Sequence, residues 1–148
     1  MSRNWQQPPE NTLESLRHGI LHSDGIELDL RRTSDGQLIV HHDAKPSATK
    51  WQESKNKKYV EDITSEEMRG LGFPTIQEVL ADSQIRTELI EHGKFICLEL
   101  KRPHPQSISG PGFFSSNELI GTIAESISQL DIALSEFEIP QQSTVYYA

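Results

Sequence analysis

Two carboxylates two residues apart, Glu27 and Asp29, are the first side chains whose types and spacing could do chemistry. They lie in the run 26–31, where apolar and polar residues alternate as they do in a half-buried strand. Because strand side chains point alternately to opposite faces, both carboxylates leave the same face. Neighbouring carboxylates repel unless a cation lies between them, and Mg²⁺ and Ca²⁺ prefer oxygen ligands. The pair therefore indicates half of a divalent cation site.

A histidine follows on the second run of the same hairpin. The Asp35-Gly36 turn favours a hairpin that brings the alternating run 38–43 back along the first strand. This turn places the imidazole of His42 near the carboxylate pair. A simpler interpretation stays open at this point, because acidic residues that alternate on a strand often form only the solvated face of a half-buried sheet.

A third run, 95–101, carries an acid and a base on one face, Glu99 and Lys101, with apolar residues on the other. Helical patterns separate this run from the first, and strand-helix-strand units give parallel strands with helices on their outer face. The charged side chains then face away from the helices. In a β/α barrel, that side carries the active site at the carboxyl ends of the strands.

The elements that must position these residues follow from capping and apolar periodicity. Four helices and a last strand are expected: a helix capped by Asn11 or Thr12 that ends near His22, one from Thr64 to about Leu71, one from Pro74 and Thr75 to near Gly93, one capped by Asn117 that ends at Ile139-Pro140, and a strand at 144–147. The lysine-rich segment 44–58 shows no periodicity and is expected to be a loop, which is either solvated or attracts an anionic substrate.

Composition narrows the classes of partner. A chain of 148 residues with 34% hydrophobic and 24% charged residues has the length and composition of one soluble domain, 1–148. The net charge of −8 repels nucleic acids and anionic membranes, so neither is expected as the main partner. No run is long and apolar enough for a transmembrane helix or a signal peptide, and the single Cys97 lies in an apolar run. We therefore expect a cytoplasmic protein in a reducing compartment.

Six segments in register resemble the glycerophosphodiester phosphodiesterase family, a group of β/α-barrel enzymes. The similar segments run in family order over nearly the whole chain: 9–14 (PENTLE), 26–29 (IELD), 33–36 with 40–43 (TSDG and VHHD), 60–64 (VEDIT), 74–80 (PTIQEVL) and 98–101 (LELK). The resemblance implies an α/β fold of the TIM-barrel type, of which the first strands and helices are present. It also implies a metal-dependent phosphoric diester hydrolase of lipid metabolism, which cleaves glycerophosphodiesters to an alcohol and glycerol phosphate.

The resemblance assigns roles to particular residues. Three acidic residues are implied as ligands of Ca²⁺ or Mg²⁺: Glu27, Asp29 and Glu99. His42 is implied as a catalytic acid or base, and Lys101 as a contact to the substrate phosphate. The family's first strand ends in His-Arg-Gly, and those positions fall on 1–3 here, so Arg3 can stand for the family arginine only after a shift in register.

Two interpretations of this difference stay open. The sequence is either part of a working phosphodiesterase domain, or a shortened relative that binds metal and phosphate without catalysis. Because a partial barrel leaves a strand edge and the inner face of its sheet uncovered, self-association is also expected.

Overall fold

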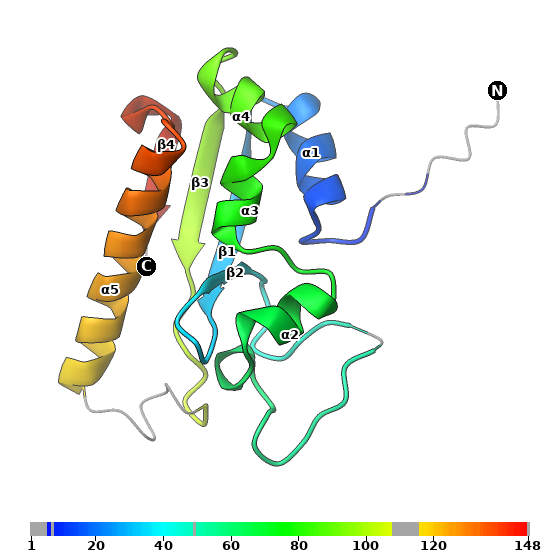
Figure 1. The fold of residues 1–148 in the computed structure, drawn as a ribbon, viewed down its shortest axis with the longest axis vertical. Helices are drawn as coiled ribbons and strands as arrows, with labels where there is room; N and C mark the ends of the chain where they lie inside the picture. Colours follow the sequence, from blue (N-terminus) through cyan, green and yellow to red (C-terminus); the bar gives the residue numbers. More distant parts are fainter. Residues whose placement is uncertain (1–5, 7, 49, 108–115, 148) are drawn as a thin grey trace.

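One mixed sheet of four strands runs through the described part of the chain, which comprises residues 6, 8–48, 50–107 and 116–147 of a computed structural model (Figure 1). The strands are β1 (Gly25–Arg32), β2 (Leu38–Val40), β3 (Phe95–Leu100) and β4 (Thr144–Tyr147). Their order is β2-β1-β3-β4, in which β1, β3 and β4 are parallel and β2 is antiparallel. The expected hairpin, parallel pairing and last strand are confirmed.

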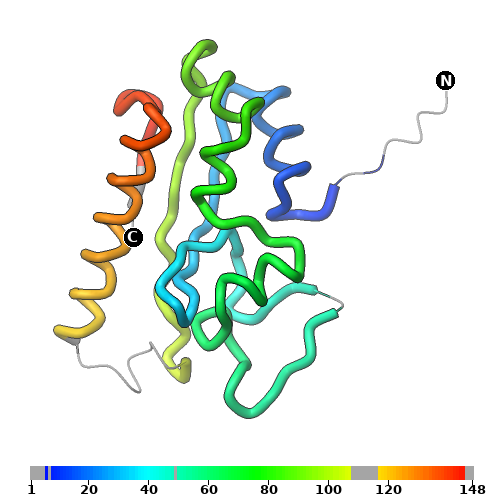
Figure 2. The backbone as a smooth tube through the Cα atoms, viewed as in Figure 1, coloured from blue at the N-terminus to red at the C-terminus, as the bar shows by residue number. Residues whose placement is uncertain are grey.

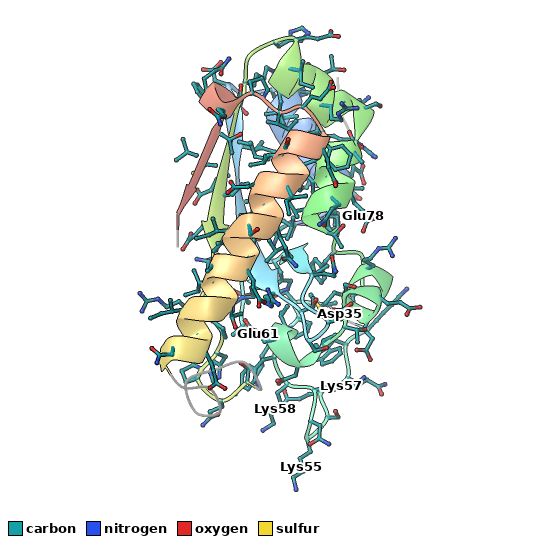
Figure 3. The ribbon with its side chains drawn as sticks, turned by 60° about the vertical axis from the view of Figure 1, so that its left-hand side comes forward. Asp35, Lys55, Lys57, Lys58, Glu61 and Glu78 are labelled. Atoms are coloured by element: carbon teal, nitrogen blue, oxygen red, sulfur yellow. The ribbon has the colours of Figure 1, made fainter. Side chains whose placement is uncertain are left out.

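The helices are α1 (Leu13–Leu21), α2 (Ser65–Gly70), α3 (Ile76–Ala81), α4 (Ser83–Ile90) and α5 (Ser116–Glu136), with short 3₁₀ turns η1 (Val60–Asp62) and η2 (Gln141–Ser143). All of these helices except α2 cover one face of the sheet, whereas Met68 of α2 packs with Ile39 of β2 on the other face. Figure 3 shows the strands on one side of the molecule and α5, α3 and α4 on the other. No helix in the described ranges is long and apolar enough to cross a membrane.

The main core lies between the sheet and these helices. Alternate residues of the two central strands are buried there: Leu28, Leu30, Ile96, Leu98 and Leu100. These strand residues pack in one cluster with apolar residues of α1, α3, α4 and α5. Each fully buried leucine or isoleucine contributes about 1.5–3 kcal/mol relative to an exposed one. Because this face is fixed by burial, the intervening residues of β1 and β3 must point the other way.

A second, smaller core lies beneath the segment that follows β2. We call it the rim core, and its buried residues are Ile39, Val60, Ile63, Met68 and Phe73. Figure 2 shows β2, the loop residues 44–48 and 50–58, and α2 at the end of the sheet where β1 and β3 finish. The middle strand residue Ile39 faces this core while its neighbours face the main core, so β2 is buried on both sides.

The β1–β2 turn is anchored by Asp35, which is labelled in Figure 3. Its carboxylate accepts hydrogen bonds from the backbone N–H and hydroxyl of Ser65, at 2.9 and 2.6 Å, and from the hydroxyl of Thr33. Burial would raise the pKa of Asp35, but the bonds from Ser65 and Thr33 outweigh it and lower the pKa. The turn is therefore attached to the start of α2.

Two expectations for the helices are wrong. The segment 74–93 forms two helices rather than one, because Asp82 adopts an extended backbone (φ −64°, ψ 123°) and caps both α3 and α4. Its carboxylate accepts from the backbone N–H of Ile85 at 3.1 Å and from Nε of Arg17 on α1 at 2.6 Å. The last helix begins at Ser116, so Asn117 lies inside α5 and is not its cap.

Replacing Asp82 by alanine is expected to destabilise the fold by about 2 kcal/mol, because an N-cap is lost and Arg17 loses its buried partner. Asp82→Asn is the matched control, since asparagine caps a helix equally well but carries no charge. Urea unfolding measures both variants. Equal destabilisation by alanine and asparagine would show that the cap contributes nothing.

The face of the sheet opposite α1, α3, α4 and α5 is covered at β2 by the rim core. Towards β4 this face is exposed, since Phe95 and Val145 lie on it and are 54% and 56% exposed. The self-association expected from the sequence stays a prediction: sedimentation velocity of the 148-residue chain should show dimers or larger species. A single monomeric species over a wide concentration range would contradict it.

Candidate active site

The parallel register of β1 and β3 brings three carboxylates together on the face of the sheet opposite α1, α3, α4 and α5. Asp29 lies directly opposite Glu99, and Glu27 lies two pairs earlier, opposite Cys97. One carboxylate oxygen from each acidic residue lies within 4.8 Å of the others, and we call this group the carboxylate cluster: Glu27, Asp29 and Glu99. The residues expected to share a site are thus neighbours, although their role as metal ligands stays a prediction.

A lysine lies against this cluster. The Nζ of Lys101 is 3.0 Å from Oε1 of Glu99 and 3.4 Å from Oδ1 of Asp29. The hydrogen bond to Glu99 raises the pKa of Lys101, so its ammonium group stays charged. Burial raises the pKa of Asp29, and the positive charge of Lys101 acts against that rise. The charged ammonium group of Lys101 therefore lies among the three carboxylates of the cluster.

His42 lies beyond β2 on the same edge. The backbone N–H of His41 donates to the carbonyl of Asp29 at 2.9 Å, which carries the hairpin pairing past the end of β2 and keeps this segment next to the cluster. The imidazole of His42 is 64% exposed, and its Nδ1 is 2.8 Å from Oδ1 of Asp43. Hydrogen bonds from His42 and Ser47 lower the pKa of Asp43, so this carboxylate is ionised. An ionised carboxylate can only accept, so the Nδ1 of His42 must carry the proton that it donates to Asp43. The Nε2 atom is then available to a substrate.

His41 has a structural role beside this pair. Its side chain is fully buried against Phe73, its Nδ1 lies 2.9 Å from the carbonyl of Asp43, and its Nε2 accepts from the backbone N–H of Ser47 at 3.1 Å. A ring that donates at Nδ1 and accepts at Nε2 is neutral. Burial lowers the pKa of His41, in agreement with this tautomer. The loop that holds Asp43 is therefore fixed by a neutral histidine.

Stability is expected to fall as the pH drops below 6.5, the ordinary pKa of histidine, because the unfolded chain then binds a proton that native His41 resists. The loss continues until the pH passes the lowered native pKa, by at most about 1.4 kcal/mol per pH unit. Urea unfolding on either side of pH 6.5 measures it. His41→Gln should remove this part of the pH dependence, and the exposed His22→Gln should keep it; an unchanged profile in His41→Gln would contradict the assignment.

A cleft of about 670 Å³ opens beside His42. The segment 9–12 before α1 forms one wall, and Asp43, Ser47 and Lys50 form another. The cleft lies next to the exposed imidazole and could admit a small-molecule substrate. The lysines 55, 57 and 58 point away from the sheet in Figure 3, and Lys57 pairs with Glu67 on α2.

The donor set fits a hard divalent cation. The cluster offers only carboxylate oxygens, the ligands that Ca²⁺ and Mg²⁺ prefer. Cys97 lies next to it, but burial together with the negative charges of Glu27 and Glu99 raises the pKa of the thiol, so a thiolate ligand is disfavoured.

The structure brings together the carboxylate cluster and Lys101, with His42 beside them, whereas Arg3 lies outside the described residues. The sequence did not single out Asp43, although this residue follows His42 directly, or the buried ion pair between Arg31 and Glu61. Alternation in β1 places Arg31 on the site face, but no local pattern indicates Glu61 as its partner.

The fold and the site together define a partial α/β barrel with a carboxylate site at the carboxyl ends of parallel strands. The chain belongs to the glycerophosphoryl diester phosphodiesterase family, whose model matches residues 2–116. The expected family and fold class are therefore confirmed.

Individual relatives agree with this assignment. A glycerophosphodiester phosphodiesterase of Bacillus altitudinis is 46% identical over 63 residues, which are 41% of this chain and 24% of that relative. Two solved structures are similar in fold. One is a glycerophosphodiester phosphodiesterase from Agrobacterium tumefaciens (20% identity, TM-score 0.60). The match covers 94% of this chain and 52% of that structure. The other is an Oleispira antarctica phosphodiesterase in complex with the product sn-glycerol-3-phosphate (21% identity, TM-score 0.58), and the match covers 95% of this chain and 52% of that structure.

The chain thus spans about half the length of these solved structures, and its matched segment of 63 or 64 residues spans about a quarter of the curated relatives.

Proposed function

We propose that this chain carries the metal- and phosphate-binding part of a phosphodiesterase that hydrolyses glycerophosphodiesters to an alcohol and glycerol phosphate. Such diesters arise when phospholipids lose their acyl chains, so the reaction belongs to lipid turnover. The observation that supports the proposal most is the carboxylate cluster with Lys101 among its oxygens, at one strand end beside an exposed imidazole.

The carboxylate cluster would hold Ca²⁺ or Mg²⁺. A divalent cation bound there supplies positive charge to the nonbridging oxygens of the phosphodiester as charge builds on them. The remaining steps fall to the chain's own side chains. The ammonium of Lys101 binds a phosphate oxygen, since it already lies among the acids that would surround the cation.

His42 would act as the general acid or base of the reaction. Asp43 holds its Nδ1 and stabilises the imidazolium, so that Nε2 can donate a proton to the departing alcohol oxygen or accept one from the attacking water. The exposure of the ring and the cleft beside it leave room for the leaving group. The product bound by the relative from Oleispira antarctica, sn-glycerol-3-phosphate, supports glycerol phosphate as the retained half of the substrate.

Hydrolysis and cation binding test the proposal together. The purified chain is incubated with glycerophosphocholine and Ca²⁺ or Mg²⁺, and release of sn-glycerol-3-phosphate is followed with and without a chelator. Calorimetry measures cation binding by the same protein and by Asp29→Asn, with Glu125→Gln on α5 as a control. Any release by this chain should depend on the cation, and cation affinity should be at least about 10-fold lower in Asp29→Asn alone.

The two measurements separate the open interpretations. Cation binding without any hydrolysis would favour a relative that binds metal and phosphate without catalysis. Equal affinity in the parent chain and Asp29→Asn would exclude the carboxylate cluster as the cation site.

A further inference from the structure

Arg31 is a buried arginine at the end of β1, on the same strand face as Glu27 and Asp29. Its side chain is only 9% exposed. The guanidinium group makes three contacts: Nε donates to the carbonyl of His42 at 3.0 Å, and Nη1 donates to Oε1 of Glu61 at 2.8 Å and to the carbonyl of Arg102 at 3.2 Å. A single side chain therefore bonds to the backbone of the candidate acid–base residue and to the residue that follows Lys101.

The partner of this arginine is buried more deeply. Glu61 lies in η1, its side chain is 1% exposed, and Figure 3 labels it near the lower end of the sheet. Its Oε2 atom is buried and has no hydrogen-bond partner among the described residues. Burial raises the pKa of Glu61, while the charge of Arg31 acts against that rise. The carboxylate is thus kept in an environment that disfavours its charge.

A buried ion pair of this kind contributes little to the free energy of unfolding. The cost of removing two charges from water often exceeds their attraction, and apolar residues of similar size would often stabilise the site equally well or better. An arginine can instead fix the positions of several groups at once, because its planar guanidinium presents several N–H groups at fixed angles. Here the N–H groups of Arg31 bond to the segment after β2, to η1 and to the segment after β3.

The segments that Arg31 joins are the ones that must be aligned for catalysis. The N–H of Val60 donates to the carbonyl of Ala44 at 2.8 Å, so η1 is tied to the loop after His42. The N–H of Lys101 donates to the carbonyl of Leu30 at 2.8 Å, which continues the β1–β3 pairing to the residue before Arg102. The backbone is therefore fixed on both sides of the guanidinium.

We propose that Arg31, held by Glu61, is a positioning residue that fixes His42 relative to Lys101 and the carboxylate cluster. Its effect on hydrolysis rests on the proposed function, whereas its effect on the order of the backbone does not. Lysine cannot replace it, since one ammonium cannot bond to two carbonyls and a carboxylate along the same directions.

Backbone ¹⁵N relaxation of the 148-residue chain without added metal tests the proposal directly. In Arg31→Lys, the order parameters of the His42 and Asp43 amides should fall from about 0.85 to below about 0.6, or these amides should broaden by exchange. The matched control is Arg32→Lys, the next residue of β1, which pairs with the exposed Glu125 on the outer face. Unchanged relaxation of His42 and Asp43 in Arg31→Lys would overturn the proposal.

A second variant removes only the charge of the partner. Glu61→Gln keeps an oxygen that can accept from Arg31 and should give a smaller change at the same two amides. This variant also decides the question if Arg31→Lys fails to fold. Relaxation identical to that of the parent chain in Glu61→Gln, together with an unfolded Arg31→Lys, would assign the pair to stability alone and overturn the positioning role.

Kinetics separate positioning from damage to the site. In Arg31→Lys, kcat for glycerophosphocholine should fall about 10-fold to 100-fold while KM and the calorimetric Ca²⁺ affinity stay within about twofold. A matching loss of Ca²⁺ affinity would mean a general structural role and would overturn the proposal. If the parent chain neither binds Ca²⁺ nor hydrolyses the diester, the proposed function fails, and the relaxation data still decide whether Arg31 orders His42.

Discussion

Replacing His42 by asparagine is expected to lower the rate of glycerophosphodiester hydrolysis by about 10² to 10⁴-fold, the contribution of one well-placed general acid or base. Asparagine keeps a polar side chain of similar length but cannot take up or release a proton near neutral pH. The loss should appear in kcat, because the substitution leaves the proposed phosphate contacts at Lys101 and the carboxylate cluster unchanged. Release of sn-glycerol-3-phosphate measures it.

Two further variants make this result specific. Asp43→Asn keeps an acceptor for Nδ1 of His42 but removes the charge that stabilises the imidazolium, so its loss should be intermediate. His22→Asn removes another exposed histidine, whose ring stacks on His18 in α1, and should leave the rate unchanged. If His42→Asn retained more than about a tenth of the activity, another group would have to transfer the proton.

Replacing Lys101 by methionine is expected to change two properties in opposite directions. Hydrolysis should fall by about 10² to 10³-fold, because the positive charge proposed to bind the substrate phosphate is lost. Affinity for Ca²⁺ should rise by about 10-fold or more, because the same ammonium lies 3.0 Å from Glu99 and 3.4 Å from Asp29 and repels a second cation there. Calorimetry and product release measure the two effects.

The matched control for this variant is Lys94→Met. Lys94 precedes β3 and pairs with Glu88 at 2.6 Å, away from the carboxylate cluster, so neither property should change. A fall in Ca²⁺ affinity in Lys101→Met would contradict the electrostatic account and would show that the lysine organises the carboxylates rather than competing with a cation.

The strands were predictable because their signals are local. Alternation in 26–31 and 95–101 determined which side chains face the helices, and the Asp35-Gly36 turn located the hairpin. The break at Asp82 was missed because aspartate is compatible with a helix by itself. Its extended backbone is stabilised by Arg17, which lies 65 residues away in sequence. A contact of this kind leaves no trace in a local pattern.

The candidate site likewise has parts that local sequence patterns predict and parts that they do not. Carboxylates on one strand face could be identified from spacing, and the parallel pairing of β1 and β3 followed from the helices between the strands. The register that places Asp29 opposite Glu99 could be seen only in the structure. The pair of Arg31 and Glu61 could not be identified, because the two residues are 30 apart and join only when η1 packs against β1. Charged residues in a sequence are read as exposed by default, and burial of both could be seen only in three dimensions.

The division of the apolar residues between a main core and a smaller rim core has a consequence for how the molecule opens. Regions with few buried apolar contacts generally open at a lower free energy than a core sheet, so we expect the two cores to open as separate cooperative units. The amides of β1 and β3 would stay protected from hydrogen exchange while the segment 60–73 fluctuates. Because Glu61 of this segment pairs with Arg31 of β1, an opening of the rim would reach the carboxylate face through that ion pair.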